Sequence, residues 1–158
     1  MIDRLADDWE AAWSGRDAAA FAGICAPDVH YEDPLTAAPL QGPEAIAGHA
    51  ARAWGAFPDL RMDRGGDRLG GGRFVALPVK LSGTNTAPLE ALPPSGASIA
   101  LHAVFYCELD PEGRLLWRVR AFFDAYAAGV ELGILPRRGS LRERALLMIQ
   151  GYGLRLGR

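Results

Sequence analysis

The chain has 158 residues, the size of one domain with a buried core, and a formal net charge of −2 from 17 basic and 19 acidic residues. Apolar residues make up 49% and charged residues 23%, as in ordinary globular proteins. The slightly negative charge and the lack of a dense basic run argue against a nucleic-acid partner. No apolar run is long enough for a membrane-spanning helix, so we expect no membrane partner either.

The cysteines, histidines and glycines exclude several kinds of site. Cys25 and Cys107 are too few for a disulfide framework or a cysteine-rich zinc site. The acidic first eight residues are unlike a secretory signal, so we expect a cytoplasmic protein. His30, His49 and His102 lack the spacing of metal ligands, and no glycine pattern for a phosphate or a dinucleotide occurs. We therefore expect neither a metal nor any other cofactor.

The first third of the chain is predicted to be mainly helical. Trp9 and Trp13 lie four residues apart, which places them on one face of a helix. Asp17 is placed to cap a second helix, and Pro43 suits the first turn of a third. In chain order we predict a helix over 3–15, a short helix from Asp17 through Ile24, a strand over 29–33, and a helix from Pro43 that breaks at Pro58.

The rest of the chain is predicted to be mainly strand. Turn-forming glycines and prolines separate four β-type runs, over 60–67, 73–82, 98–109 and 114–126. A capping-box pattern from Ser140 to Glu143 begins a final helix that extends to about residue 151. Helices followed by successive strands predict an α+β fold with the helices on one face of a curved sheet. We expect one domain over 1–158, with a core over about 3–135.

The hairpin between the last two strands predicts which side chains share a face. Residues Asp110–Gly113 suit a type I turn followed by a left-handed glycine, in a three-residue loop. Asp110 would then pair with Arg114 and Phe122 with His102. Side chains alternate along a strand, so one face carries Asp124, Phe122, Arg120, His102 and Val104. The other face is apolar and predicted to contact another subunit or element: Trp117, Val119, Ala121 and Phe123.

Asp124 is the main candidate for chemistry. It lies in a strand of apolar and aromatic residues, where desolvation would raise its pKa into the range of a general base. His102, on the same face, could share a ligand or a water molecule with it. Two alternatives stay open. Asp124 could instead bond a backbone N–H or pair with Arg120, and His102 could be a satisfied core residue.

Other residues are candidates for the wall of a substrate pocket, among them Arg120 and Phe122 on the face of Asp124. Tyr31 and Asp33 lie two residues apart and so on one side of a strand, where they would offer a phenol and a second carboxylate. The alternative for Asp33 is simple turn chemistry. Trp13 and Trp54 lie on inward helix faces, either as core or as pocket wall. Asn85 lies in a loop that is placed to cover the mouth of a pocket.

The final helix carries an apolar stripe: Leu141, Ala145, Met148 and Ile149. Such a stripe is typical of a helix packed on a core or on a second subunit, more than of a membrane anchor. A role as a lid over the pocket is the alternative. The sequence does not distinguish between these roles.

Taken together and in order, these residues resemble the SnoaL-like polyketide cyclases of the nuclear-transport-factor-2-like superfamily, which also includes ketosteroid isomerases. The likeness covers about residues 5–135. Its pieces are Trp13 with Asp17, Ala26-Pro27-Asp28-Val29, Tyr31-Glu32-Asp33-Pro34, Gly42-Pro43-Glu44-Ala45-Ile46, Phe57-Pro58-Asp59-Leu60, Ser82-Gly83-Thr84, Leu92-Pro93-Pro94-Ser95-Gly96, and Asp110–Gly113 leading to Phe123-Asp124.

The resemblance implies a cone-shaped α+β barrel that encloses an apolar pocket, in a homodimer formed through the outer face of the sheet. It also implies that Asp124, matching an acid/base Asp on the last strand, and His102 on the preceding strand are catalytic. The chain differs in having Phe122 where cyclases often have a second histidine. It also has Asn85 where many relatives have histidine after Gly-Thr.

The leading hypothesis is a cofactor-independent enzyme that acts on a hydrophobic carbonyl compound. Asp124 would remove a proton, and His102, with Tyr31 or Asn85, would stabilise the enolate in a dry pocket. Intramolecular aldol cyclisation or double-bond isomerisation would follow. The alternatives are an epoxide hydrolase or dehydratase on the same fold, and a non-catalytic, dimeric module that binds a small molecule.

Overall fold

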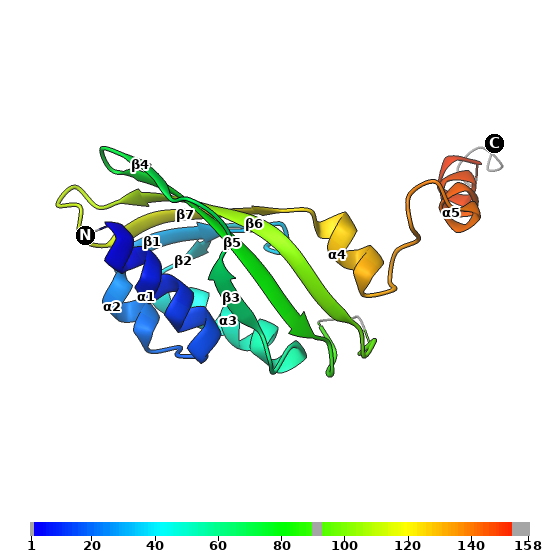
Figure 1. Cartoon of the computed structure of the whole chain (residues 1–158), viewed down its shortest axis with the longest axis horizontal. Helices are drawn as coiled ribbons and strands as arrows, with labels where there is room; N and C mark the ends of the chain where they lie inside the picture. The colour runs from blue at the N-terminus through cyan, green and yellow to red at the C-terminus, as the bar shows by residue number, and fades with distance from the viewer. Residues whose placement is uncertain (1, 90–92, 153–158) are drawn as a thin grey trace.

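The computed structural model describes residues 2–89 and 93–152 and has the expected α+β architecture (Figure 1). Its helices are α1 (Ile2–Gly15), α2 (Ala20–Ile24), α3 (Pro43–Ala56), α4 (Ala125–Glu131) and α5 (Leu141–Tyr152). Its strands are β1 (Cys25–Glu32), β2 (Leu40–Gln41), β3 (Arg61–Arg64), β4 (Leu69–Gly71), β5 (Phe74–Thr84), β6 (Ser98–Leu109) and β7 (Leu116–Phe123).

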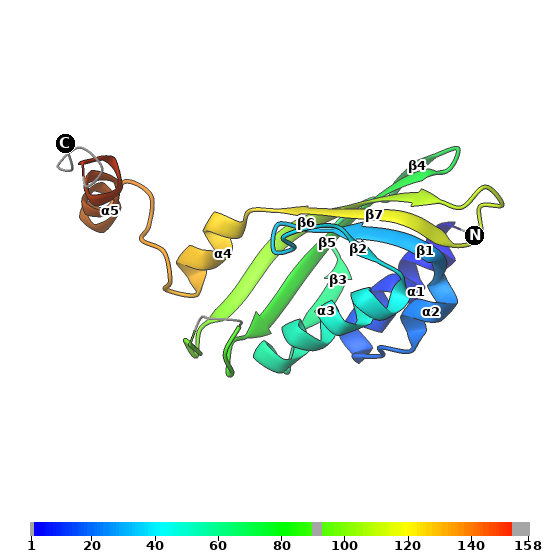
Figure 2. The ribbon, with the colours of Figure 1, turned by 180° about the vertical axis from the view of Figure 1, so that it is seen from behind.

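The strands form one mixed sheet in the order β2-β1-β7-β6-β5-β3, and β4 adds to β5. All pairs are antiparallel except β1 with β7, which are parallel. The sheet is open between β2 and β3, so it does not close into the expected barrel. Helices α1, α2 and α3 cover one face of it (Figure 2), which is the cone-like arrangement. This covered face is called the inner face below.

Aromatic side chains join the helices to the inner face of the sheet. Trp9 of α1 is fully buried, and its ring contacts those of Phe21, Tyr31 and Phe105 at centroid distances of 5.4 to 6.1 Å. The contacts with Phe21 and Phe105 are edge-to-face and that with Tyr31 is tilted, and such aromatic pairs add to the free energy gained by burying the rings. The recurrence of tryptophans that predicted the first helix therefore also marks the centre of the core.

The local signals for the starts of α3 and α5 are confirmed, and that for α2 lies a turn too early. The Asp17 side chain accepts hydrogen bonds from the backbone N–H groups of Ala19 and Ala20, at 3.0 and 3.2 Å, in the turn before α2, whose N-cap is Ala19. Pro43 is the first residue of α3, after Gly42 at a φ of +82°. At α5, the backbone N–H of Glu143 donates to Ser140 Oγ at 3.1 Å. These interactions are short-range, so the sequence pattern was enough to predict them.

The predicted register of the β6–β7 hairpin is wrong by two residues. Phe122 pairs with Val104 instead of His102, and the ladder is irregular after Glu108. The cause is Asp110, whose carboxylate accepts the backbone N–H groups of Arg114 and Leu115 and so holds them in a longer loop. Because a two-residue shift preserves alternation, the predicted grouping of side chains on each face still holds.

The assignment of those two faces to interior and surface is reversed. The face with Val119 and Ala121 lies in the core, at 1% and 3% exposure. The face with Arg120, Phe122 and His102 is exposed, and 53% of Phe122 is accessible. The apolar strip was expected to contact another subunit or another element, and the second of these is correct, because the molecule's own helices cover it. The face that carries the expected site is the outer one.

The last strand ends earlier than predicted. β7 ends at Phe123. Asp124 caps the helix α4 by accepting the N–H of Ala127 at 2.9 Å, and this helix was not predicted from the sequence. Beyond it, α5 stands away from the sheet (Figures 1 and 2). Its side chains Leu141, Met148 and Ile149 are 81%, 60% and 71% exposed, so they do not pack on the core of this molecule, and packing on a second subunit stays a prediction.

Candidate functional site

An apolar pocket of about 290 Å³ lies between the inner face of the sheet and helices α1, α3 and α4. Leu81, Ile99, Leu101, Phe105 and Phe123 line it from β5, β6 and β7. Among the described residues around it, polar side chains come from Tyr31, Asp33, His49 and the Trp13 indole. A largely carbon-lined hollow with a few converging polar groups is the usual form of a small-molecule site.

The polar groups of the pocket are joined through Asp33, the residue that follows β1. Its Oδ2 accepts a hydrogen bond from the Tyr31 hydroxyl at 2.8 Å and contacts His49 Nε2 at 2.7 Å. Only 5% of the Asp33 side chain and 11% of the His49 side chain are exposed. A carboxylate, an imidazole and a phenol thus share one dry corner of the pocket.

The other carboxylate oxygen of Asp33 organises the chain behind the site. Oδ1 accepts the backbone N–H groups of Leu35 and Thr36, at 2.8 and 3.0 Å, and Thr36 Oγ1 donates to the Asp33 carbonyl at 2.9 Å. This is the turn chemistry considered for Asp33, and the side chain also reaches the pocket. The two interpretations of Asp33 are compatible, because Oδ1 holds the turn and Oδ2 forms the contacts with Tyr31 and His49 in the pocket.

The surroundings of Asp33 keep its carboxylate ionised. Burial raises the pKa of Asp33, but the hydrogen bond and charge of His49, with the bonds from Tyr31 and the Leu35 N–H, outweigh burial and lower it below its usual value. Burial, together with the Asp33 charge and hydrogen bond, raises the pKa of Tyr31 well above its usual value. Tyr31 is therefore a neutral donor to an anionic Asp33 at physiological pH.

His49 reaches the site from the middle of α3, which packs beside β1. Its Nδ1 lies 3.4 Å from Arg52 Nη2, an atom that can only donate. In the neutral ring that contact makes Nδ1 the acceptor and places the hydrogen on Nε2, and in the charged ring both nitrogens carry a hydrogen. In either form, Nε2 is the donor to Asp33. From the sequence, His49 was rejected as a metal ligand and was given no role in the site. The detectable signal was a histidine on the inward face of a helix that follows a strand-terminal Asp.

The structure places the two expected catalytic residues elsewhere. Asp124 is exposed and serves as the N-cap of α4, so the prediction that its carboxylate lies in an apolar hollow is wrong. His102 is exposed on the outer face, so its expected place beside a pocket is wrong too. The alternative considered for Asp124, a strand-terminal carboxylate that bonds a backbone N–H, describes it correctly.

The other predicted pocket residues divide between wall, core and surface. Trp13 lines the pocket, whereas Trp54 is a core residue whose indole donates to the Trp13 carbonyl at 2.9 Å. Asn85 is buried and holds its own loop by donating to the Ala87 carbonyl and accepting the Ser95 N–H. Arg120 and Phe122 lie on the outer face, so the structure does not bring these two, Trp54 or Asn85 to the pocket.

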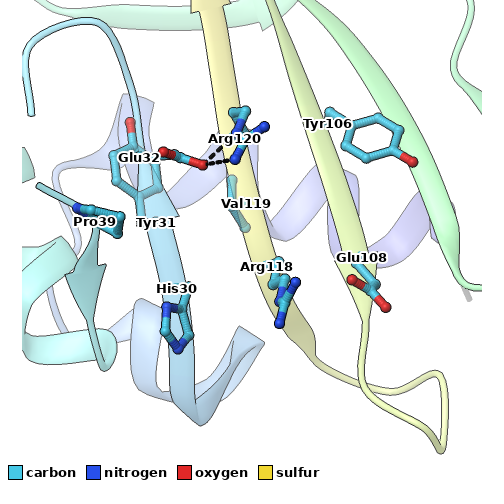
Figure 3. A pocket seen from close by; sticks show the side chains of 9 residues that line it. All are labelled: His30, Tyr31, Glu32, Pro39, Tyr106, Glu108, Arg118, Val119 and Arg120. Carbon is cyan, nitrogen blue, oxygen red and sulfur yellow. Dashed lines mark hydrogen bonds and ion pairs between the residues drawn. The ribbon is translucent and has the colours of Figure 1, made fainter.

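The outer face carries a second, more polar groove of about 390 Å³ (Figure 3). Arg120 forms an ion pair with Glu32 across it, and His30, Arg118 and Glu108 also line it. Exposed ion pairs of this kind contribute little free energy and are screened by salt. The inner pocket therefore has the better claim to be the functional site, because its charged group is buried.

Thiol and metal chemistry have little support in the described part of the chain. Burial raises the pKa of Cys25 to about 12 and that of Cys107 still further, so neither is a thiolate at neutral pH. Residues 2–89 and 93–152 contain no group of three side chains that could hold a metal ion. Within the same ranges, no helix has the length and hydropathy needed to cross a bilayer.

Comparisons with known proteins agree with this architecture. A family model described as the SnoaL-like domain matches residues 6–117. TsrD from Streptomyces laurentii is 20% identical, with a TM-score of 0.74 over 85% of this chain and 96% of TsrD. IdmH from Streptomyces antibioticus, a proposed polyketide cyclase, is 19% identical, with a TM-score of 0.70 over 83% of this chain and 97% of IdmH.

A third similar structure is a hypothetical protein with a ketosteroid isomerase-like fold from Catenulispora acidiphila. It is 17% identical, with a TM-score of 0.71 over 83% of this chain and 93% of its own. At such identities the likeness shows the fold alone. No protein with a curated description matches this chain.

Proposed function

The chain belongs to the family of SnoaL-like domains, and from that premise we propose that it is a cofactor-independent enzyme that moves a proton on a hydrophobic carbonyl compound. The apolar pocket would hold the hydrocarbon part of the substrate, and the reacting carbon would lie beside Asp33. The resulting reaction is either a double-bond isomerisation or an intramolecular aldol cyclisation. Both begin with the same enolate.

In this proposal Asp33 is the base. Its oxygen removes a proton from a carbon next to a carbonyl group, and the C–H electrons move into the carbonyl to form an enolate. In an isomerisation Asp33 returns the proton to another carbon. In a cyclisation the enolate carbon attacks a second carbonyl of the same molecule, and the new alkoxide takes up the proton. Because the Asp33 pKa is lowered, the substrate carbon has to be acidified, for example by two flanking carbonyls.

His49 has the role of holding and tuning Asp33. Its Nε2–H lies 2.7 Å from the carboxylate, so it fixes the orientation of Asp33 and stabilises the ionised form. Tyr31 donates to the same oxygen at 2.8 Å. The observation that supports the proposal most directly is this buried carboxylate, held by two side-chain donors in the wall of an otherwise apolar pocket.

A second candidate is a module that binds a small molecule without changing it. The observation that favours it is that Asp33 already accepts four hydrogen bonds, from Tyr31, His49 and the backbone of Leu35 and Thr36. A carboxylate with four donors is a weaker base than a free one. On this view the cluster only shapes the pocket, and a bound compound leaves unaltered.

The test is the opening of 5-nitrobenzisoxazole, an apolar probe that ring-opens when a base removes one proton from carbon. The expected result is catalysis by the wild type and a loss of about 100-fold or more in Asp33→Asn, the usual contribution of a positioned base. The matched control is Asp124→Asn, which removes a carboxylate at the end of the neighbouring strand and should change the rate less than about twofold. Equal losses in both variants would contradict the proposal, and tight binding of the probe without turnover would favour the binding module.

We also propose that the protein forms the expected homodimer through the outer face of the sheet. The outer face exposes Phe74, Val104, Tyr106 and Phe122, at 39% to 53%, on neighbouring strands. Exposed apolar side chains gathered on one face are typical of a subunit interface. In sedimentation analysis the wild type should be dimeric and Phe122→Asp should be monomeric. A monomeric wild type at micromolar concentration would exclude this arrangement.

A further inference from the structure

One wall of the inner pocket is built by α4 and the turn that follows it. The residues of this segment that line the pocket carry no polar side-chain atom: Ala128, Gly129, Leu132, Ile134 and Leu135. The segment lies outside residues 6–117, which match the family model. It is called the closing wall below. Its residues come from a different part of the chain than the polar cluster of β1 and α3.

Three hydrogen bonds hold the closing wall, one to strand β6 and two within the segment itself. The Glu131 carboxylate accepts the backbone N–H of Ala100 on β6 at 2.9 Å. The Leu135 N–H donates to the Gly129 carbonyl at 2.9 Å. The Tyr126 hydroxyl donates to the Pro136 carbonyl at 2.8 Å, which holds the chain just beyond Leu135. These defined hydrogen bonds hold the closing wall in place.

Leu135 can take its place because residue 129 is glycine. A Cβ atom at position 129 would lie 2.7 Å from Leu135 Cδ1 and 3.0 Å from its Cγ, closer than carbon atoms pack. The leucine side chain therefore lies flat against the backbone of α4 while it lines the pocket. Leu135 is thus one of the side chains that bound the pocket on that side.

We propose that Leu135, seated on Gly129, limits the length of the apolar part of the ligand. The ligand class that fits is an uncharged hydrophobic molecule with one hydrogen-bonding end. That end would bind at Asp33 and His49, and its hydrocarbon part would run through the pocket toward the closing wall. The inference rests on the proposed function only in using the same pocket as the binding site.

The experiment measures binding of 4-alkylphenols of increasing chain length by isothermal titration calorimetry. For the wild type, each added methylene should tighten binding by about fourfold until the chain meets Leu135, after which longer chains gain nothing. In Leu135→Ala this limit should move to a chain at least one carbon longer, and in Leu135→Phe to a shorter one. Leu147→Ala, the same truncation at an exposed position of α5, should keep the wild-type limit.

Opposite shifts of the limit in the two Leu135 variants support the inference. An unchanged limit in both, or a wild type that binds none of the phenols, overturns it. The same titrations on Asp33→Asn separate this result from the proposed function. If the limit still depends on position 135 while 5-nitrobenzisoxazole is not opened by the wild type, the length selection stands and the proton-transfer function fails. If the probe is opened but the limit does not move, the proton-transfer function stands and the length selection fails.

Discussion

Asp33 and Asp124 occupy equivalent positions on two neighbouring parallel strands, yet their surroundings differ completely. Each follows the last residue of its strand, β1 or β7, and each accepts a backbone N–H within the next three residues. Asp33 lies in the pocket wall beneath helix α3, which supplies His49. Asp124 is instead the N-cap of α4 and is exposed to solvent. The comparison shows that a carboxylate becomes a candidate base through what packs over it, not through its place on a strand.

The largest expected difference between the two faces of the sheet concerns stability. Phe105 of the inner face is 2% exposed and Phe122 of the outer face is 53% exposed. Phe105→Ala should lower the free energy of unfolding by about 3–5 kcal/mol, because it removes a buried ring and leaves a cavity. Phe122→Ala should change it by less than about 0.5 kcal/mol. Urea unfolding of both variants, at a concentration where the wild type does not associate, measures the difference.

A smaller difference is expected when each carboxylate is removed. Asp33→Ala leaves the buried donors of Tyr31 and His49 without an acceptor, at a cost of about 1–3 kcal/mol for each donor that finds no new partner. Asp124→Ala removes one helix cap and should cost about 1 kcal/mol. Thermal or urea unfolding distinguishes the two variants, and a greater loss for Asp124→Ala would contradict the burial described for Asp33.

The dependence of stability on pH sharpens the same comparison. The pKa of Asp33 is lower in the folded protein than the usual unfolded value of about 3.9, so its ionisation stabilises the fold above that pH. This contribution is lost as the pH falls from the unfolded pKa through the folded one. Unfolding free energies measured from pH 7 down to pH 3 should therefore fall less steeply for Asp33→Asn than for the wild type. Asp124→Asn, which keeps Asp33, should follow the wild-type slope.

Much of the fold was predictable because its signals are local. The spacing of Trp9 and Trp13, Pro43 after Gly42 and the Ser140–Glu143 pattern each act over a few residues, and α1, α3 and α5 occur where they indicate. The Asp17 cap lies in the turn before α2, which begins at Ala20. The start of helix α4 was missed because Phe122, Phe123 and Tyr126 are aromatic side chains, which favour strands, so the strand was predicted to continue to Tyr126. The hairpin register was missed because Asp110 captures two backbone N–H groups, a detail that no residue pattern shows.

The candidate site was predictable only in part. Tyr31 and Asp33 follow from their spacing on one strand, and Trp13 from its inward helix face. His49 could not be paired with Asp33 in advance, because their contact depends on how α3 lies across β1. Leu135 belongs to the pocket only because α4 returns over the sheet. To predict His49 and Leu135 as site residues, one needs the relative positions of two elements. Those positions depend on contacts between residues that are far apart in the sequence.

By itself the sequence determined the α+β class, the helix starts, the alternation of side chains along the strands and the family of the chain. These depend on backbone propensities and side-chain periodicity, which are written into neighbouring residues. Only the tertiary structure decided which face of the sheet became the interior, since either alternating face could have received the helices. That choice buried Asp33 and exposed Asp124, because desolvation depends on the packing of distant segments.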